Sequence, residues 1–442
     1  MLQKYRNCFR SKSASHGCYF LERICKYYII VRRAGQSYPV ADGMGGRMTA
    51  EFKPLEGIRV VEMSHMVMGP SCGMFLAFLG AEVVKVEPPG GDKTRQLTGM
   101  GSAFFPLFNR RKKSVVLDSR TPAGKEALNR LLASADVFID NFKDSTLQGM
   151  GLDAETLHER FPHLICASHK GFLSGPYERR TALDEVVQMM SGLAYMTGPK
   201  GRPLRVGTSA NDIMGGLFGA FAIIAALFER GKTGGGRTIR VGLFENCLLL
   251  VSQHMVQFEL EGRDPEPMPE RAFSWPIYDV FADAEGGQIF IGAVSDGHWT
   301  RLCGYLGLDD LLQHPELQSR MARINARSWV VPLVAAAVAR RPMAELLPAL
   351  EKMEIPFAPV AKPSDLFRDQ HVMRQGGLAS SQTADGRTFR APALPIEIDG
   401  ASLAGGGDVD SIGGHNAEIL GSLGLTPEEV AAAAKAPSGE AA

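Results

Sequence analysis

Strand-like and helix-like segments alternate from Leu55 to Ser168, and this alternation limits the folds open to the chain. In a parallel sheet each strand must be followed by a crossover, usually a helix, before the next strand can pair in the same direction. We expect strands at 58–63, 82–87, 114–118, 136–141 and 163–168, and helices at 70–79 and 122–134. The sequence therefore predicts a doubly wound, Rossmann-like α/β domain.

A Pro-rich segment at 263–276 separates two parts of the chain, whose 442 residues suggest two domains. It follows a helix expected from Glu245 to about Leu260, and its prolines resist regular structure, as is typical of a linker. Before it, we expect residues 48–262 to form the first part of the large domain.

After the linker, we expect a smaller α+β domain at 277–350. It begins with a hairpin of 277–282 and 288–293 around Glu285-Gly286-Gly287 and continues as helices to about Met353. A strand at 356–360 and a helix after Lys362 then begin the return to the large domain. That return occupies 351–432, and 433–442 is expected to be a disordered tail.

Residues 1–47 differ from the rest of the chain, with nine Lys or Arg against two acidic residues and no clear period. Such a composition is typical of an organellar transit peptide. An over-long start, with the true one at Met44 or Met48, explains the missing amphipathic pattern better. We therefore interpret 1–47 as a disordered or misannotated extension.

The composition excludes several kinds of partner. Lys plus Arg equals Asp plus Glu at 48 each, so no net charge draws the chain to nucleic acid or to anionic lipid. The longest wholly apolar runs are shorter than the roughly 20 residues that span a bilayer, so we expect no membrane segment. The seven cysteines show no CxxC and no zinc spacing, which indicates reduced thiols in the cytoplasm and no metal site. We expect four of them to be small core residues: Cys72, Cys166, Cys247 and Cys303.

Two nucleotide-binding motifs are missing. The first strand-to-helix turn, Ser64 to Pro70, lacks the G-x-G-x-x-G that lets a dinucleotide pyrophosphate approach the helix, which argues against an oxidoreductase. Gly231-Lys232-Thr233 resembles the end of a P-loop, but Ala226 stands where the leading glycine belongs. An NTPase is therefore not expected.

Asp212 is the candidate nucleophile. It stands just before the apolar stretch Leu217–Phe228, which predicts a helix buried in a domain core. A carboxylate held between a hydrated loop and a dry interior is partly desolvated, and this makes it reactive. The alternative is a helix-capping aspartate, and the helix N-terminus would then lower its pKa.

Two segments are candidates for anion binding. The run Asn109 to Ser114 contains four consecutive cations at the start of a strand, a pattern that fits either a phosphate seat or a solvated face. Arg95 is a second possible phosphate contact in a Gly-containing loop. Asn141 and Phe142 follow a predicted strand, where ligands of such sheets bind.

These pieces, in this order, resemble the class III CoA-transferases, the CaiB/BaiF family that includes formyl-CoA transferase. The resemblance runs from Leu55 to about Val430. The matching segments are Leu55–Met63, Gly69-Pro70, Leu79–Glu87, Gly91-Asp92 with Arg95, Asn109-Arg110 to Leu117-Asp118, Asp136-Val137 with Asn141-Phe142, Leu193–Gly198, Lys232–Gly236 and Gly414-His415-Asn416.

The resemblance implies that Asp212 attacks an acyl-CoA thioester and forms an aspartyl-acyl anhydride, which CoA reopens to an aspartyl-CoA thioester. It implies no tightly bound cofactor, coenzyme A as cosubstrate, a di- or hydroxy-carboxylic acid as acceptor, and dimers interlocked like chain rings. Our own inference is that backbone N–H groups near Gly215 and Gly216 stabilise the tetrahedral oxyanions.

The resemblance also implies CoA contacts. Leu117, Arg120, Asn141 and Phe142 fall on matched positions, and we add Arg95, Arg110 and Asp184. Asp184 either orients the site or the CoA arm, or caps the helix that follows it. The chain departs from formyl-CoA transferase at three positions: Val67 replaces a glutamine, and Pro88 and Gly149 replace arginines.

The same family contains α-methylacyl-CoA racemases, which need a His and an Asp as bases on opposite faces of the acyl α-carbon. The racemase histidine belongs directly before Asp184, where this chain has Leu183. A leucine cannot transfer a proton, so we favour the transferase over a racemase or another acyl-CoA isomerase. A non-catalytic CoA-binding protein with the same fold is the third alternative.

Overall fold

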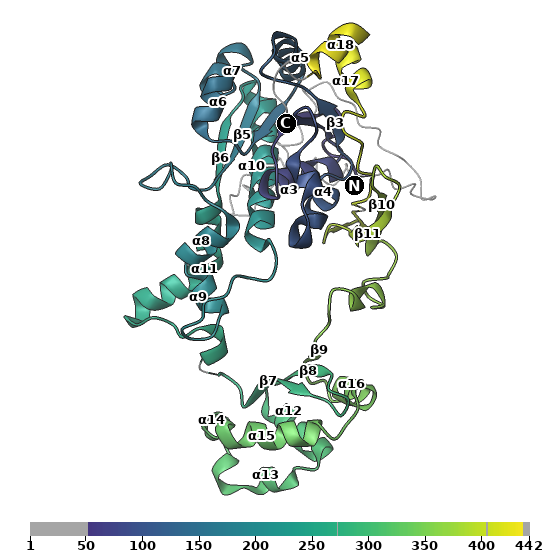
Figure 1. The fold of residues 1–442 in the computed structure, drawn as a ribbon. Coiled ribbons are helices and arrows are strands. Elements are labelled where there is room, and N and C mark those ends of the chain that lie inside the picture. Colours follow the sequence, from purple (N-terminus) through teal and green to yellow (C-terminus); the bar gives the residue numbers. More distant parts are fainter. Residues whose placement is uncertain (1–51, 272, 404, 436–442) are drawn as a thin grey trace, which may run out of the picture. The chain divides into compact units, whose positions relative to one another are not determined.

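The computed structural model describes residues 52–271, 273–403 and 405–435 (Figure 1). The predicted extension at 1–47 lies outside the described residues. Within them, a six-stranded parallel sheet dominates the fold. Its strands are β1 (Arg59–Met63), β2 (Glu82–Glu87), β3 (Lys113–Val116), β4 (Val137–Asp140), β5 (Ile165–Lys170) and β6 (Thr238–Gly242).

The strand order, β3-β2-β1-β4-β5-β6, is that of a doubly wound Rossmann-like sheet. All neighbours are parallel, with Val60 opposite both Val83 and Val137 in the centre. The predicted fold class is therefore confirmed, and five of the six strands lie where we expected them. The sequence pattern did not predict β6, a five-residue strand that follows a Gly-rich turn.

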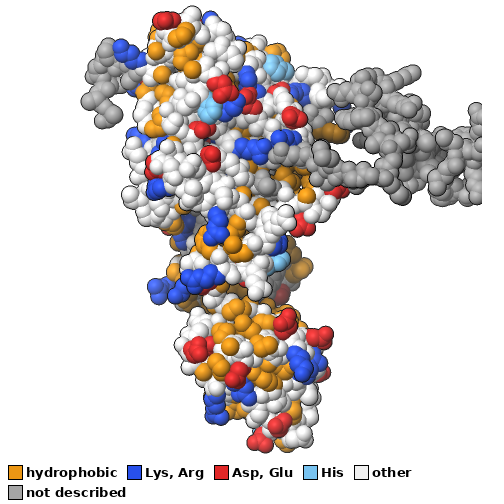
Figure 2. Space-filling model, turned by 90° about the vertical axis from the view of Figure 1, so that its right-hand side faces the viewer, with side chains coloured by type: hydrophobic (Ala, Val, Ile, Leu, Met, Phe, Trp, Pro, Cys, Tyr) orange, Lys and Arg blue, Asp and Glu red, His pale blue; other side chains and the backbone are white. Residues whose placement is uncertain are grey.

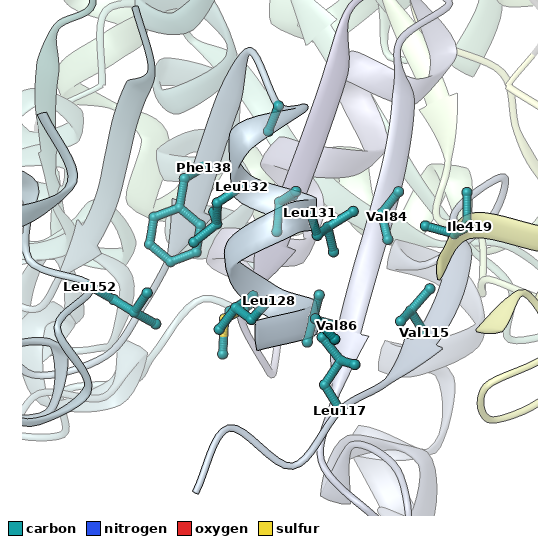
Figure 3. Packing of buried hydrophobic residues seen from close by; sticks show 14 of the residues in the cluster. Val84, Val86, Val115, Leu117, Leu128, Leu131, Leu132, Phe138, Leu152 and Ile419 are labelled. Carbon is teal, nitrogen blue, oxygen red and sulfur yellow. The ribbon is translucent and has the colours of Figure 1, made fainter. Parts of the chain in front are cut away.

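Helices cover both faces of the sheet, because alternate residues of each strand point to opposite sides. On one face, Val84, Val86, Val115 and Leu117 pack against the leucines of α5, with Ile419 from the C-terminal part beside them (Figure 3). The helices near this face are α5 (Pro122–Ala133), α6 (Asp144–Met150) and α7 (Ala154–Arg160).

The other face carries α3 (Met68–Phe78) and α10 (Ala210–Thr233). These helices approach closely because glycines of α10 face α3: a Cβ on Gly216 would lie 1.9 Å from Ser71 Oγ and 2.7 Å from Met68 O. A short helix, α4 (Phe104–Phe108), precedes β3. Three more helices belong to this half of the chain: α8 (Asp184–Met190), α9 (Leu193–Thr197) and α11 (Leu243–Glu261).

The prediction that Leu217–Phe228 is a helix buried in a domain core holds for one of its faces only. Only one face of α10 packs inward, and large apolar side chains stand exposed along the other. They recur at helical spacing: Leu217, Phe221, Ile224 and Phe228. Among the described residues, α10 is also the one helix whose length and composition would let it cross a membrane. Its packing on α3 and the sheet is that of a core helix with one unpartnered face.

Residues 277–359 form their own sheet and their own hydrophobic cluster, where the small domain was expected. The hairpin strands β7 (Ile277–Ala282) and β8 (Gln288–Ala293) have the predicted bounds, and β9 (Phe357–Pro359) pairs with β8. The helices are α12 (Asp296–Leu306), α13 (Asp309–Gln313), α14 (Arg320–Asn325), α15 (Arg327–Val338) and α16 (Met343–Lys352). Figure 2 shows hydrophobic side chains gathered on one face of this part, and acidic and basic groups interspersed elsewhere.

The C-terminal part departs from expectation in two places. The helix predicted after Lys362 is only a turn, Asp365–Phe367, followed by the antiparallel pair β10 (Leu378–Gln382) and β11 (Thr388–Pro392) and the short pair β12 (Glu397–Ile398) and β13 (Ala401–Ser402). The helices α17 (Asn416–Ser422) and α18 (Pro427–Ala433) then return to the large sheet. Ala433 is buried and its carbonyl accepts from Asp118 N, so the predicted tail does not begin there; residues 436–442 lie outside the description.

Candidate active site

A cavity of about 880 Å³ opens beyond the carboxyl ends of the central strands. It is lined by residues at or after the ends of four strands: Met63–Met66 for β1, Val86–Pro89 for β2, Leu117–Arg120 for β3 and Phe142 for β4. The order of the sheet reverses between β1 and β4, and ligands of such sheets bind at this switch point. The cavity therefore lies where the fold itself favours a ligand.

The wall at the switch point is held by Asn141. Its side chain accepts from His65 N at 3.2 Å and donates to His65 O at 2.8 Å, so it fixes the loop after β1 rather than facing the cavity. The Phe142 and His65 rings, with centroids 6.2 Å apart, both line the cavity. Burial lowers the pKa of His65, so its imidazole is neutral near pH 7.

Of the expected CoA contacts, Leu117, Arg120 and Phe142 line the cavity, whereas Asn141 does not. Arg120 is bound to Asp118, with NH2 3.0 Å from Oδ2, and its side chain remains largely exposed. Pro88 and Gly149, which stand where formyl-CoA transferase has arginines, line the cavity as well. The two positions that the resemblance to formyl-CoA transferase assigns to arginines therefore carry no charge in the wall of this cavity.

Arg95 and Arg110 do not line the cavity. The Arg95 guanidinium binds both oxygens of Glu87, at 2.8 and 2.7 Å, and stacks 3.8 Å above the Phe105 ring. The Arg110 side chain is buried; it donates to Leu107 O and lies 5.1 Å from the Phe78 ring. Both arginines hold the protein together at these positions, in contrast to the phosphate contacts that we expected.

The cation run at 109–114 does not provide a phosphate seat through Lys112 either. Lys112 is buried, with Nζ 2.7 Å from Glu62 Oε2, and Lys85 Nζ lies 3.2 Å from the other oxygen of the same carboxylate. Burial lowers the pKa of Lys112 to about 8, while the two ammonium groups, acting against burial, hold the pKa of Glu62 below its usual value. Lys113, in turn, binds Glu82 and Glu418. Local sequence did not reveal these distant carboxylates.

Two lysines that the sequence analysis missed line the cavity, Lys93 and Lys125. Both are exposed, and neither has an ion-pair partner among the residues that the structure describes. The cavity carboxylates of Glu87, Asp92 and Asp118 are instead paired with arginine or lysine. Lys93 follows a Gly-containing loop, and Lys125 lies in the first turn of α5. Their positions near strand ends could have indicated ligand contacts, whereas a single lysine in the sequence does not.

Asp212 is the third residue of α10 and is partly buried. Ser209 is the N-cap residue, and its side chain makes no capping hydrogen bond, so Asp212 does not occupy the N-cap position. Burial raises the pKa of Asp212 to about 7; Asp184 adds to this shift, and Arg205 opposes it. The expectation that the helix N-terminus would lower this pKa is therefore wrong, because burial outweighs it.

Asp184 does not line the cavity, but its charge acts on Asp212. It is the first residue of α8, and its Oδ2 accepts from Gln188 Nε2 at 2.7 Å and from Arg205 NH2 at 2.9 Å. Burial raises the pKa of Asp184 as well. Leu183, directly before it, is 61% exposed and offers no proton-transferring group.

The glycines after Asp212 face α3. Gly215 and Gly216 are the sixth and seventh residues of α10, where N–H groups bond within the helix, so they are not free to bind an oxyanion as we inferred. The free N–H groups belong to the first turn, which contains Asp212 itself. The four core cysteines are buried free thiols, as predicted, and burial raises the pKa of Cys166 to about 12.

Comparison with known proteins identifies the family. A model of the family described as CoA-transferase family III matches residues 55–415, which is most of the chain. The chain belongs to CoA-transferase family III. As a member of this family it is an enzyme that transfers CoA, and CoA thioesters are the cosubstrates of such enzymes.

Two curated family III relatives match nearly their whole length. The succinate–glutarate CoA-transferase of Agrobacterium fabrum is 31% identical over 84% of this chain and 96% of its own length. The succinyl-CoA–D-citramalate CoA-transferase of Chloroflexus aurantiacus is 30% identical over 86% and 96%. Among solved structures, a CaiB/BaiF family protein from Brucella suis has a TM-score of 0.76 and 31% identity, covering 84% of this chain and all of its own.

Proposed function

We propose that this family III CoA-transferase moves CoA from a CoA thioester to a free dicarboxylic acid, with Asp212 as the nucleophile. The observation that carries the proposal is Asp212 itself: a partly buried carboxylate in the uncapped first turn of α10, with a pKa raised to about 7. A raised pKa makes the ionised carboxylate more basic and therefore more nucleophilic.

The reaction needs no redox step and no external base. The Asp212 carboxylate attacks the thioester carbonyl, the C–S bond breaks, and CoA thiolate leaves behind an aspartyl-acyl anhydride. The thiolate then attacks the aspartyl carbonyl and releases the donor acid, which leaves an aspartyl-CoA thioester. The acceptor carboxylate repeats the sequence in reverse and regenerates Asp212. Exclusion of water protects the anhydride, and positioning supplies much of the rate.

The nucleotide part of CoA fits the cavity at the strand ends. The Phe142 ring and Leu117 offer apolar contacts, and Lys93, Lys125 and Arg120 supply positive charge around its wall. These cations are well suited to phosphate groups, since charge-assisted contacts are the strong ones. We propose that Lys93 and Lys125 supply the positive charge that two arginines of formyl-CoA transferase would supply at the positions of Pro88 and Gly149.

A dicarboxylic acid is proposed as acceptor because of the relatives. The names of both curated relatives contain acids with two carboxyl groups, succinate with glutarate and succinate with citramalate. A panel of CoA thioesters incubated with mono- and dicarboxylic acids, read by mass spectrometry of the CoA products, tests this choice. Faster transfer to monocarboxylic acids would contradict it.

A second copy of the chain is the proposed partner. The apolar stripe of α10 is exposed, and Met255, Val256, Phe258 and Leu260 of α11 are exposed as well. Exposed apolar faces with several large side chains, in a chain of balanced charge, are typical of protein interfaces. We propose that they are covered in a homodimer, interlocked as the family resemblance implies.

The covalent step is tested with hydroxylamine. After addition of succinyl-CoA, hydroxylamine should convert the activated aspartate to a hydroxamate, detected by peptide mass spectrometry at Asp212. The Asp212→Asn variant should give no adduct while still binding CoA, and transfer should fall by about 10³-fold or more. An adduct on another residue would overturn the nucleophile. Deuterium exchange at the α-carbon of a 2-methylacyl-CoA in D2O would instead indicate a racemase or isomerase.

A further inference from the structure

The segment that leads into the catalytic helix is held by α8. Val206 N donates to Gln188 Oε1 at 2.9 Å, and Gln188 Nε2 donates to Asp184 Oδ2 at 2.7 Å. Arg205 NH2 donates to the same oxygen of Asp184 at 2.9 Å and to Thr208 O at 3.3 Å. The stretch 205–208 is therefore fixed at both ends, directly before α10 begins at Ala210.

Two carboxylates lie in the first turns of the helices that this network connects. Asp184 is the first residue of α8 and Asp212 is the third residue of α10. Arg205 is the cation of this network, and its other terminal nitrogen lies 3.3 Å from Glu185 Oε1. The Arg205 and Asp184 side chains are largely buried, at 18% and 8% exposed, so water screens these charges little.

We propose that Arg205 is the positioning residue of the active site: bound to Asp184 and to the Thr208 carbonyl, it fixes the start of α10 and offsets the charge of Asp184 there. This inference rests on the proposed role of Asp212. Without the guanidinium, the charge of Asp184 would act on Asp212 uncompensated in a poorly hydrated place, and this favours the protonated form of Asp212. A protonated Asp212 cannot attack a thioester.

Arg205 has two distinct roles, and one experiment separates them. As an anchor it holds the backbone at Thr208, and as a cation it compensates Asp184. The pKa of Asp212 is raised first by burial, then by Asp184, and is lowered by Arg205, so the signs of the two charge substitutions are opposite. Loss of the anchor alone lowers the rate at every pH, whereas loss of the charge moves the pH dependence.

The test is the pH profile of kcat/KM for CoA transfer from succinyl-CoA to glutarate. Arg205→Gln should move the acid limb to higher pH by about one pH unit, and Asp184→Asn should move it to lower pH. Arg205→Lys, which keeps the charge, should leave the limb near that of the wild type. The double variant should lie between the single ones, as the two charges cancel.

Arg202→Gln is the matched control, because Arg202 lies in the same loop and is exposed. Its limb should stay in place. If the Arg205→Gln and Asp184→Asn limbs coincide with that of the wild type, Arg205 has no such role, even if the rates fall. If Asp212→Asn keeps the wild-type rate, the proposed role of Asp212 as nucleophile is wrong. This result differs from an unchanged acid limb in the Arg205 and Asp184 variants, so the failure of each proposal can be recognised.

Discussion

Substitution of Gly216 by alanine tests whether the approach of α10 to α3 positions the active site. A Cβ at this position would lie 1.9 Å from Ser71 Oγ, 2.7 Å from Met68 O and 2.8 Å from Cys72 N. Two of these atoms belong to the backbone of α3, so the helices must separate. Overpacking of this kind costs about 1–3 kcal/mol, and the gain in helix propensity offsets at most about 1 kcal/mol. We expect the Gly216→Ala variant to be less stable by about 2 kcal/mol.

Gly231→Ala is the matched control in the same helix. Gly231 is exposed near the end of α10, and a Cβ there would meet nothing within 4 Å, so this variant should gain about 0.5 kcal/mol. Thermal unfolding followed by circular dichroism at equal protein concentration should therefore place the two midpoints about 3 °C apart. Because Asp212 lies one turn before Gly216, kcat/KM should fall only in the Gly216→Ala variant. Equal midpoints for the two variants would refute the close contact.

Three further outcomes are expected. In the proposed mechanism only the ionised form of Asp212 attacks, so kcat/KM should rise about tenfold between pH 6 and pH 8, with its midpoint near the pKa of about 7. A flat profile in buffers of constant ionic strength would contradict this. Lys93→Ala and Lys125→Ala should each raise the KM for the CoA thioester about tenfold with little change in kcat, whereas Lys352→Ala, an exposed lysine outside the cavity, should leave KM unchanged. Phe221→Asp should shift the protein from dimer to monomer in light scattering, and a wild-type mass at all concentrations would argue against the α10 interface.

The bounds of several strands could be predicted from residue type and from the turn residues on either side. The strands 82–87, 277–282 and 288–293 have the expected bounds, because each is rich in β-branched or aromatic residues and lies between turn residues. The exposed face of α10 could not be predicted, since an apolar helix in a core and one awaiting a partner have the same composition. The strands after Lys362 were missed because their sequences, such as Leu378–Gln382, are polar and half-exposed.

The cations of the site show why charge runs mislead. Arg110 and Lys112 look like a phosphate seat in sequence, but their partners are residues from other elements: Glu62 for Lys112 and the Phe78 ring for Arg110. Local sequence spacing does not show an ion pair between residues of different strands. A cation is available to a ligand only where its side chain is exposed. Lys93 and Lys125 stand outside any charge run in the sequence, yet both are exposed at the cavity.

The pKa of Asp212 shows which of two opposing effects dominates at a helix N-terminus. A helix end stabilises a carboxylate by about 0.3–1 kcal/mol, and by about 2 kcal/mol in the most favourable sites. A pKa of about 7 in place of 3.8 corresponds to about 4 kcal/mol against the charged form, and partial exposure of Asp212 reduces this value. Burial together with the charge of Asp184 therefore outweighs the effect of the helix N-terminus, and the Arg205 charge opposes them. A nucleophile that is half ionised at neutral pH combines high basicity with a usable population of the attacking form, which a fully exposed aspartate does not offer.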